Sequence, residues 1–205
     1  MYTQSGRSMV EMLGVLAIIG VLSVGAIAGY SKAMFKYKLN KHAEAVNMLI
    51  NNSLILKDKV VSGTNMHDIL EKTNSLPDGI YRSGNFRLYD RYFHVPMWIY
   101  WNTNATDGSY GGIQFNFSAS VEGREICRNI VIAAKENAAN LWLVEVGKKD
   151  SPDDTTEHYV GHLYGDAHCT ARQRECLRNL DLDKIDKLCS PCTTDSCNIY
   201  TLWRT

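Results

Sequence analysis

The chain of 205 residues has no excess charge, because 22 lysines and arginines balance 22 aspartates and glutamates. A protein dedicated to nucleic acid usually has a basic surplus, so the composition argues against that function. The chain has only four prolines and no low-complexity run, and 45% of its residues are hydrophobic. The composition therefore argues against wholesale disorder, and the length suits one domain, alone or with a short anchor.

The two ends of the chain lack different residue types. No cysteine occurs before Cys127, and the last 79 residues hold all six. No charged residue occurs among residues 12–31. Residues 1–62 carry seven basic side chains against three acidic ones, and residues 63–205 cancel this surplus of four. The chain therefore combines two parts of different construction.

The uncharged run predicts a membrane-spanning helix. Its twenty residues would form about 30 Å of helix, which is the thickness of the hydrocarbon core of a bilayer. A cleaved secretory signal has a shorter apolar run, a basic start and a small-residue cleavage site after the run. Here Tyr30, Ser31 and Lys32 continue the helical pattern instead. We therefore expect residues 7–31 to lie in the membrane.

One acidic residue, Glu11, stands directly before the uncharged run. A carboxylate near the centre of a bilayer costs a few kcal/mol, less near the end of a span, and an acid kept there indicates a functional site. The alternative is that Glu11 only reaches the lipid headgroups. The residues Gly6-Arg7-Ser8-Met9-Val10-Glu11, followed by the long apolar run, resemble the processing motif of type IV prepilins.

The resemblance implies a specific processing and assembly scheme. In that family a prepilin peptidase cuts after the glycine and methylates the new amino terminus, and a glutamate is fifth in the mature chain. It implies a leader of residues 1–6, cleavage between Gly6 and Arg7, and methylation of Arg7. Glu11 would pair with the terminal amine of a neighbouring copy, which recovers part of its desolvation energy and sets the axial register. Two features depart from the family: Arg7 replaces the usual Phe, Met or Leu, and the leader has no basic residue.

The flanking charges and the cysteines predict opposite orientations. Lysines 32, 36, 38 and 41 follow the span, and the positive-inside rule would place them in the cytoplasm. Six clustered cysteines instead favour an oxidising compartment. The resemblance implies the second arrangement, in which the prepilin sits in the inner membrane with its head in the periplasm before it enters an extracellular pilus.

The helical pattern continues beyond the membrane. Val46, Leu49, Ile50, Ser53 and Val60 recur at helical spacing, and no proline occurs before Pro77. We expect one helix over residues 8–62, with an amphipathic half over residues 32–62 that packs on a globular head of residues 63–205. The lack of an early proline resembles the type IVb group. The predicted fold class is α+β, with the long helix against a small antiparallel sheet and a disulfide-rich C-terminal region.

The expected order of elements in the head also resembles type IVb pilins. Residues 64–76 predict a short helix, with Asn65 as its N-cap, that ends at the turn Pro77-Asp78-Gly79. Residues 80–112 are irregular and rich in aromatics, with a possible strand over 92–101 that Pro96 breaks. Core or subunit packing explains these aromatics better than single-stranded nucleic acid. The later elements are a strand over 113–121, a turn at Gly123, a helix over 124–138, a strand over 141–146, a helix over 180–188 and a strand over 198–203.

The six cysteines allow fifteen complete pairings. A thioredoxin-like site requires a CxxC that follows a strand and opens a helix, whereas Cys189-Ser190-Pro191-Cys192 follows an expected helix. A zinc site of Cys189, Cys192, Cys197 and His168 has suitable ligands at irregular spacing. Structural disulfides are the preferred interpretation. The resemblance implies a bridge between Cys127 and Cys189, which leaves Cys169–Cys176 and Cys192–Cys197 as local pairs.

The remaining motifs predict no catalytic residue, cofactor or metal. The carboxylates of Asp150, Asp153, Asp154 and Glu157 suit a calcium loop, as in type II secretion pseudopilins, but a solvated acidic loop is the simpler interpretation. No HExxH, GxSxG or P-loop sequence occurs. We therefore expect a structural pilin rather than an enzyme, with a pseudopilin or minor pilin as the alternative. An alternative of another class is a membrane-anchored periplasmic thiol-redox or zinc protein. The expected partners of a pilin are copies of itself, prepilin peptidase, the inner-membrane assembly machinery and lipid.

Overall fold

The computed structural model describes residues 9–59, 66–84, 87–102, 109–118, 120–149, 156–170 and 175–204. The chain divides into two compact units, Met1–Lys38 and Leu39–Thr205. Helix α1 (Met9–Leu56) begins in the first unit and ends in the second, and a short 3-10 turn, Lys57–Lys59, follows it. The long helix expected from the sequence is confirmed, although α1 ends six residues before Ser62.

The described part of the first unit is helical. Its side chains are exposed apart from a partly covered Phe35. The run has a mean hydropathy of 2.4 over its most apolar window, with none of that window buried. By length and composition it is able to cross a membrane.

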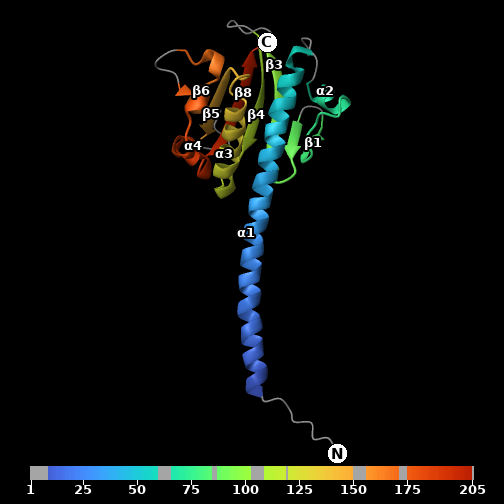
Figure 1. Cartoon of the computed structure of the whole chain (residues 1–205), viewed down its shortest axis with the longest axis vertical. Coiled ribbons are helices and arrows are strands. Elements are labelled where there is room, and N and C mark those ends of the chain that lie inside the picture. The colour runs from blue at the N-terminus through green and yellow to red at the C-terminus, as the bar shows by residue number, and fades with distance from the viewer. Residues whose placement is uncertain are drawn as a thin grey trace, which may run out of the picture. The chain divides into compact units, whose positions relative to one another are not determined.

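The second unit is built on one eight-stranded sheet with the order β1-β2-β3-β4-β8-β5-β6-β7 (Figure 1). Every neighbouring pair is antiparallel except β6 and β7. The strands are β1 (Ile80–Ser83), β2 (Arg87–Asp90), β3 (Pro96–Asn102), β4 (Tyr110–Phe117), β5 (Leu143–Lys149), β6 (His158–Tyr164), β7 (Glu175–Cys176) and β8 (Ser196–Arg204). The last strand of the chain therefore lies in the middle of the sheet, between β4 and β5.

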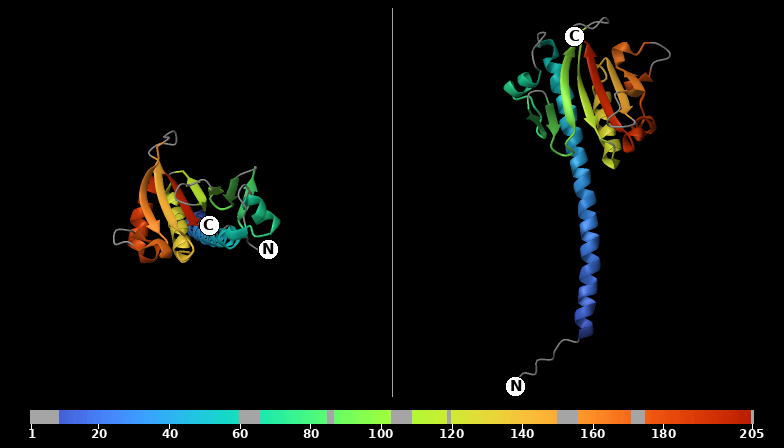
Figure 2. Two further views of the ribbon diagram at one scale, coloured as in Figure 1. Left: turned by 90° about the horizontal axis from the view of Figure 1, so that it is seen from above. Right: turned by 180° about the vertical axis from the view of Figure 1, so that it is seen from behind.

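The helices of the head cover one face of this sheet, as the view from above in Figure 2 shows. They are the C-terminal part of α1, α3 (Val121–Glu136) and α4 (Leu182–Cys189), while α2 (Met66–Lys72) lies beside β1. Val46, Leu49 and Ile50 of α1 are fully buried, as their helical spacing predicts. The opposite face carries no helix in the described ranges.

Polar contacts fix α1 beside α3. The Asn129 side-chain amide donates to the Leu39 carbonyl oxygen at 2.9 Å, and the Asn137 amide donates to Asn47 Oδ1 at 2.8 Å.

The alternation expected around Ile113 and Phe115 is confirmed in β4, where both side chains are fully buried on the helix side. Buried apolar surface thus joins both helices to the centre of the sheet.

Several sequence-based predictions need correction. Residues 80–112 are not irregular, because they contain strands β1 to β3, and Pro96 begins β3 rather than breaking a strand. The sequence pattern also gives no expectation of strand β6. Gly123 lies within α3, which begins after the N-cap Ser120. A side chain at Gly123 would stand 2.5 Å from the Cys192 carbonyl oxygen, so glycine is needed there for close approach rather than for a turn.

Candidate functional site

The structure describes only part of the processing motif, because the described residues begin at Met9. Gly6 and Arg7 lie outside the described residues. Glu11 lies in the first turn of α1, with its side chain exposed. An acid at this place is favoured by the partial positive charge of the helix N-terminus, by about 0.3–1 kcal/mol at an exposed position. Glu11 is also the only acidic residue before Glu44.

The surface that follows Glu11 is apolar on every side of the helix. Such a large apolar surface is unfavourable in water and is stabilised by lipid or by other apolar helices. The exposed large side chains of this uncharged run are Met12, Leu13, Val15, Leu16, Ile18, Ile19, Val21, Leu22, Val24, Ile27 and Tyr30. This run is therefore a membrane-insertion segment or a signal sequence.

All six cysteines form disulfides, in the pairs Cys127–Cys189, Cys169–Cys176 and Cys192–Cys197. These are the pairs that the resemblance to type IVb pilins implies. The two cysteines of the CxxC segment bond to different partners. Cys192 lies in the 3-10 turn Ser190–Thr193, and strand β8 follows this turn, so the segment does not open an α-helix. Neither cysteine therefore carries the free thiol that a CxxC redox or zinc site requires.

The acidic loop that could hold calcium is only partly described. Asp150, Asp153 and Asp154 lie outside the described residues. Glu157 accepts a hydrogen bond from the Tyr200 hydroxyl at 3.0 Å. Within the described ranges, no three histidine, cysteine or acidic side chains are grouped as metal ligands would be.

A polar row crosses the face of the sheet that lacks helices. Gln114, Tyr200, Glu145 and His162 are consecutive cross-strand partners on β4, β8, β5 and β6. The Gln114 amide donates to the Tyr200 hydroxyl oxygen at 3.1 Å, and His162 Nδ1 lies 3.0 Å from Glu145 Oε1. Burial raises the pKa of the Glu145 carboxyl, and the adjacent His162 opposes that shift. The spacing of these residues along the chain does not predict the row, because only the strand register brings its members together.

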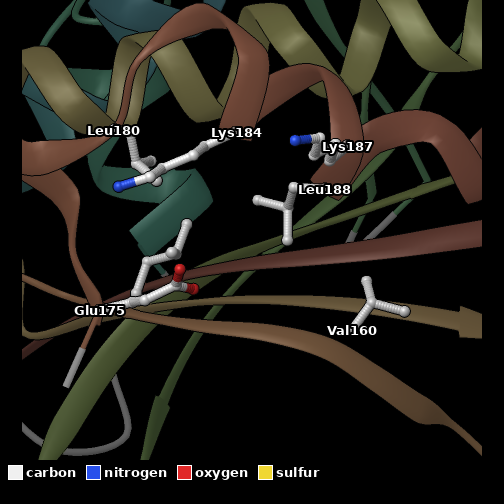
Figure 3. A pocket seen from close by; sticks show the side chains of 7 residues that line it. Val160, Glu175, Leu180, Lys184, Lys187 and Leu188 are labelled. Atoms are coloured by element: carbon white, nitrogen blue, oxygen red, sulfur yellow. The ribbon is translucent and has the colours of Figure 1, made fainter. Parts of the chain in front are cut away.

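A surface cavity of about 250 Å³ lies between α4 and the β6–β7 edge (Figure 3). Leu163, Leu180 and Leu188 supply apolar walls, while Lys184, Lys187 and Glu175 stand at the rim. Lys187 is already paired with Asp183 at 2.6 Å. The polar row does not line this cavity, so the cavity and the perturbed carboxyl do not combine into one site.

No protein-family model, curated protein or solved structure matches this chain. The resemblance to type IV pilins therefore rests on the motif at residues 6–11 and the apolar run after it. A long apolar N-terminal helix and a disulfide-linked head are compatible with that architecture.

Proposed function

We propose that this chain is a type IV pilin, most similar to the type IVb group. It is made as a membrane prepilin, cleaved and methylated by prepilin peptidase, and polymerised into an extracellular filament. The observation that carries the proposal is the Gly6–Glu11 spacing in front of a helix whose apolar side chains are exposed all round. A lipid-soluble helix with one acid at its start suits both a membrane monomer and a packed helical core.

The construction of the head supports the same proposal. A subunit exported to the cell surface needs stability without cytoplasmic chaperones, and disulfides persist in oxidising compartments. The head contains three disulfides, and its last strand lies in the centre of the sheet. It is a structural module with no catalytic role in this proposal.

Processing is the direct test. Mass spectrometry of the chain from membranes should show an N-methylated terminus at Arg7 when an active prepilin peptidase is present. The same chain in a strain without the peptidase is the control and should retain residues 1–6. Gly6→Ala should insert in the membrane but remain uncut. An intact leader beside an active peptidase, or cleavage near residue 30, would overturn the proposal.

Filament formation is the second test. Electron microscopy should show surface filaments that contain this chain in the parent strain, and these should be absent from a deletion strain. If other filaments persist in the deletion strain and the chain is a rare component of them, it acts as a minor pilin. A chain that is processed but found only below the cell surface acts as a pseudopilin.

A further inference from the structure

A groove runs between α1 and α3 on the outside of the head. It has a volume of about 220 Å³. Its lining residues are Ala43, Glu44, Asn47, Asn129, Ile132, Ala133 and Glu136. The lining is therefore mixed: three side chains are apolar, two are amides, and the two charged residues are both acidic.

The two carboxylates of the groove differ in how they are neutralised. Glu44 forms an ion pair with Lys41 at 2.6 Å. Glu136 is exposed and accepts a hydrogen bond from the Asn47 side-chain amide at 2.7 Å, but it forms no ion pair with any residue that the structure describes. Glu136 therefore presents an uncompensated negative charge beside Ile132 and Ala133.

The complementary charge lies on α1 itself. Lys32 and Lys36 are exposed, and neither forms an ion pair within the described ranges. They are four residues apart, so they project from the same side of the helix. No acid occurs between Glu11 and Glu44 to neutralise them locally. In a filament of packed helices these ammonium groups would need a partner from another copy.

We propose that the Lys32–Lys36 side of one copy docks on the α1–α3 groove of a second copy, with a lysine ammonium bound to Glu136. The inference rests on the proposed filament. The four-carbon stem of the lysine would lie along Ile132 and Ala133, and its charged end would reach the carboxylate. Apolar contacts between helices have little directional preference, whereas a lysine–carboxylate pair forms only when the two side chains meet. The pair would therefore fix the position of one head relative to the next.

Zero-length carbodiimide cross-linking of purified wild-type filaments tests the contact directly. It joins a lysine amine to a carboxylate only when the two are in contact. We expect a covalent dimer in which the peptide containing Lys32 or Lys36 is linked to the peptide containing Glu136. Wild-type filaments that yield no such linked peptide would overturn the inference and leave the pilin proposal intact. Failure of the wild-type chain to form filaments at all would count against the pilin proposal instead.

Charge reversal supplies the matched genetic test. Lys36→Glu and Glu136→Lys should each reduce filament yield by about tenfold, and the double reversal should restore most of it. The control pairs Glu136→Lys with Lys38→Glu, because Lys38 projects from another side of α1; this combination should not recover. Glu136→Gln keeps the shape of the side chain and should weaken assembly without changing the protease resistance of the head. Wild-type yields from both Glu136 variants would contradict the proposal.

Discussion

Cys127 and Cys189 lie 62 residues apart in the chain, yet their Cα atoms are 5.6 Å apart and a disulfide joins them. Both side chains are fully buried, one within α3 and the other at the end of α4. The guanidinium of Arg124 and the carboxylate of Asp186 form an ion pair between the same two helices. The bridge therefore holds the C-terminal segment against α3 just before β8 enters the centre of the sheet.

Removing this bridge should destabilise the head strongly. Cys127→Ser and Cys189→Ser should each lower the free energy of unfolding by about 4 kcal/mol in the chain-entropy account, because the bond closes a long loop. The double variant should be no less stable than either single variant. Denaturant unfolding of the full chain in detergent measures these losses.

The local bridge Cys192–Cys197 is the control for this prediction. It spans a sequence separation of five, so its removal should lower the free energy of unfolding by about 2 kcal/mol on the same account.

One outcome would contradict the prediction for the long-range bridge. If the double Cys127 and Cys189 variant is much less stable than either single variant, the two residues act separately.

We expect the buried carboxylate of Asp90 to stabilise the turn between β2 and β3. It is fully buried, and its carboxylate accepts hydrogen bonds from the backbone amides of Tyr92, Phe93 and Val95 at 2.6, 3.0 and 3.1 Å. Asp90→Ala leaves these donors without their partner and should lower the free energy of unfolding by about 3 kcal/mol. Asp90→Asn retains one acceptor oxygen and should lose less. Equal stability of the Ala variant and the parent would contradict this role.

His67 should make the head less stable in acid. The side chain is buried, and its Nε2 accepts a hydrogen bond from the Ile99 amide at 3.2 Å. Burial, and then the nearby Arg82, lower the pKa of His67 from 6.5. As the pH falls, His67 is therefore protonated in the unfolded chain before it is protonated in the folded head. The free energy of unfolding should fall as the pH drops below 6.5, by at most about 1.4 kcal/mol per pH unit.

A substitution at the same position isolates this effect. His67→Gln can still accept the Ile99 hydrogen bond but does not titrate. Thermal or denaturant unfolding between pH 7 and pH 5 should show a shallower pH dependence for this variant. An unchanged slope would assign the acid sensitivity to other groups.

Glu11→Val should impair filament assembly without impairing membrane insertion. Loss of the charge favours the membrane-inserted monomer, so the variant should be processed and remain stable in the membrane. Filament yield should nevertheless fall by at least about tenfold if the carboxylate contributes more than about 1.4 kcal/mol to each subunit contact. Immunoblots of membranes and sheared filaments measure the two quantities. Normal filaments would show that Glu11 only meets the headgroups.

The sequence alone determined the features that depend on neighbours along the chain. The unbroken apolar run from residue 12 to residue 31 predicted a long helix, because helix length and side-chain periodicity are local properties. The strict alternation at Ile113 and Phe115 predicted β4 for the same reason. The Gly6–Glu11 spacing is likewise a pattern read directly from the chain.

Only the tertiary structure decided the relationships between distant segments. Strands β1, β2 and β6 are short or polar, and their pairing with neighbouring strands stabilises them more than their own propensity does. Glu44 and Glu136 are 92 residues apart and line one groove only because α1 and α3 pack on the same face of the sheet. The row from Gln114 to His162 depends on strand register, which non-local hydrogen bonds set and residue spacing does not reveal.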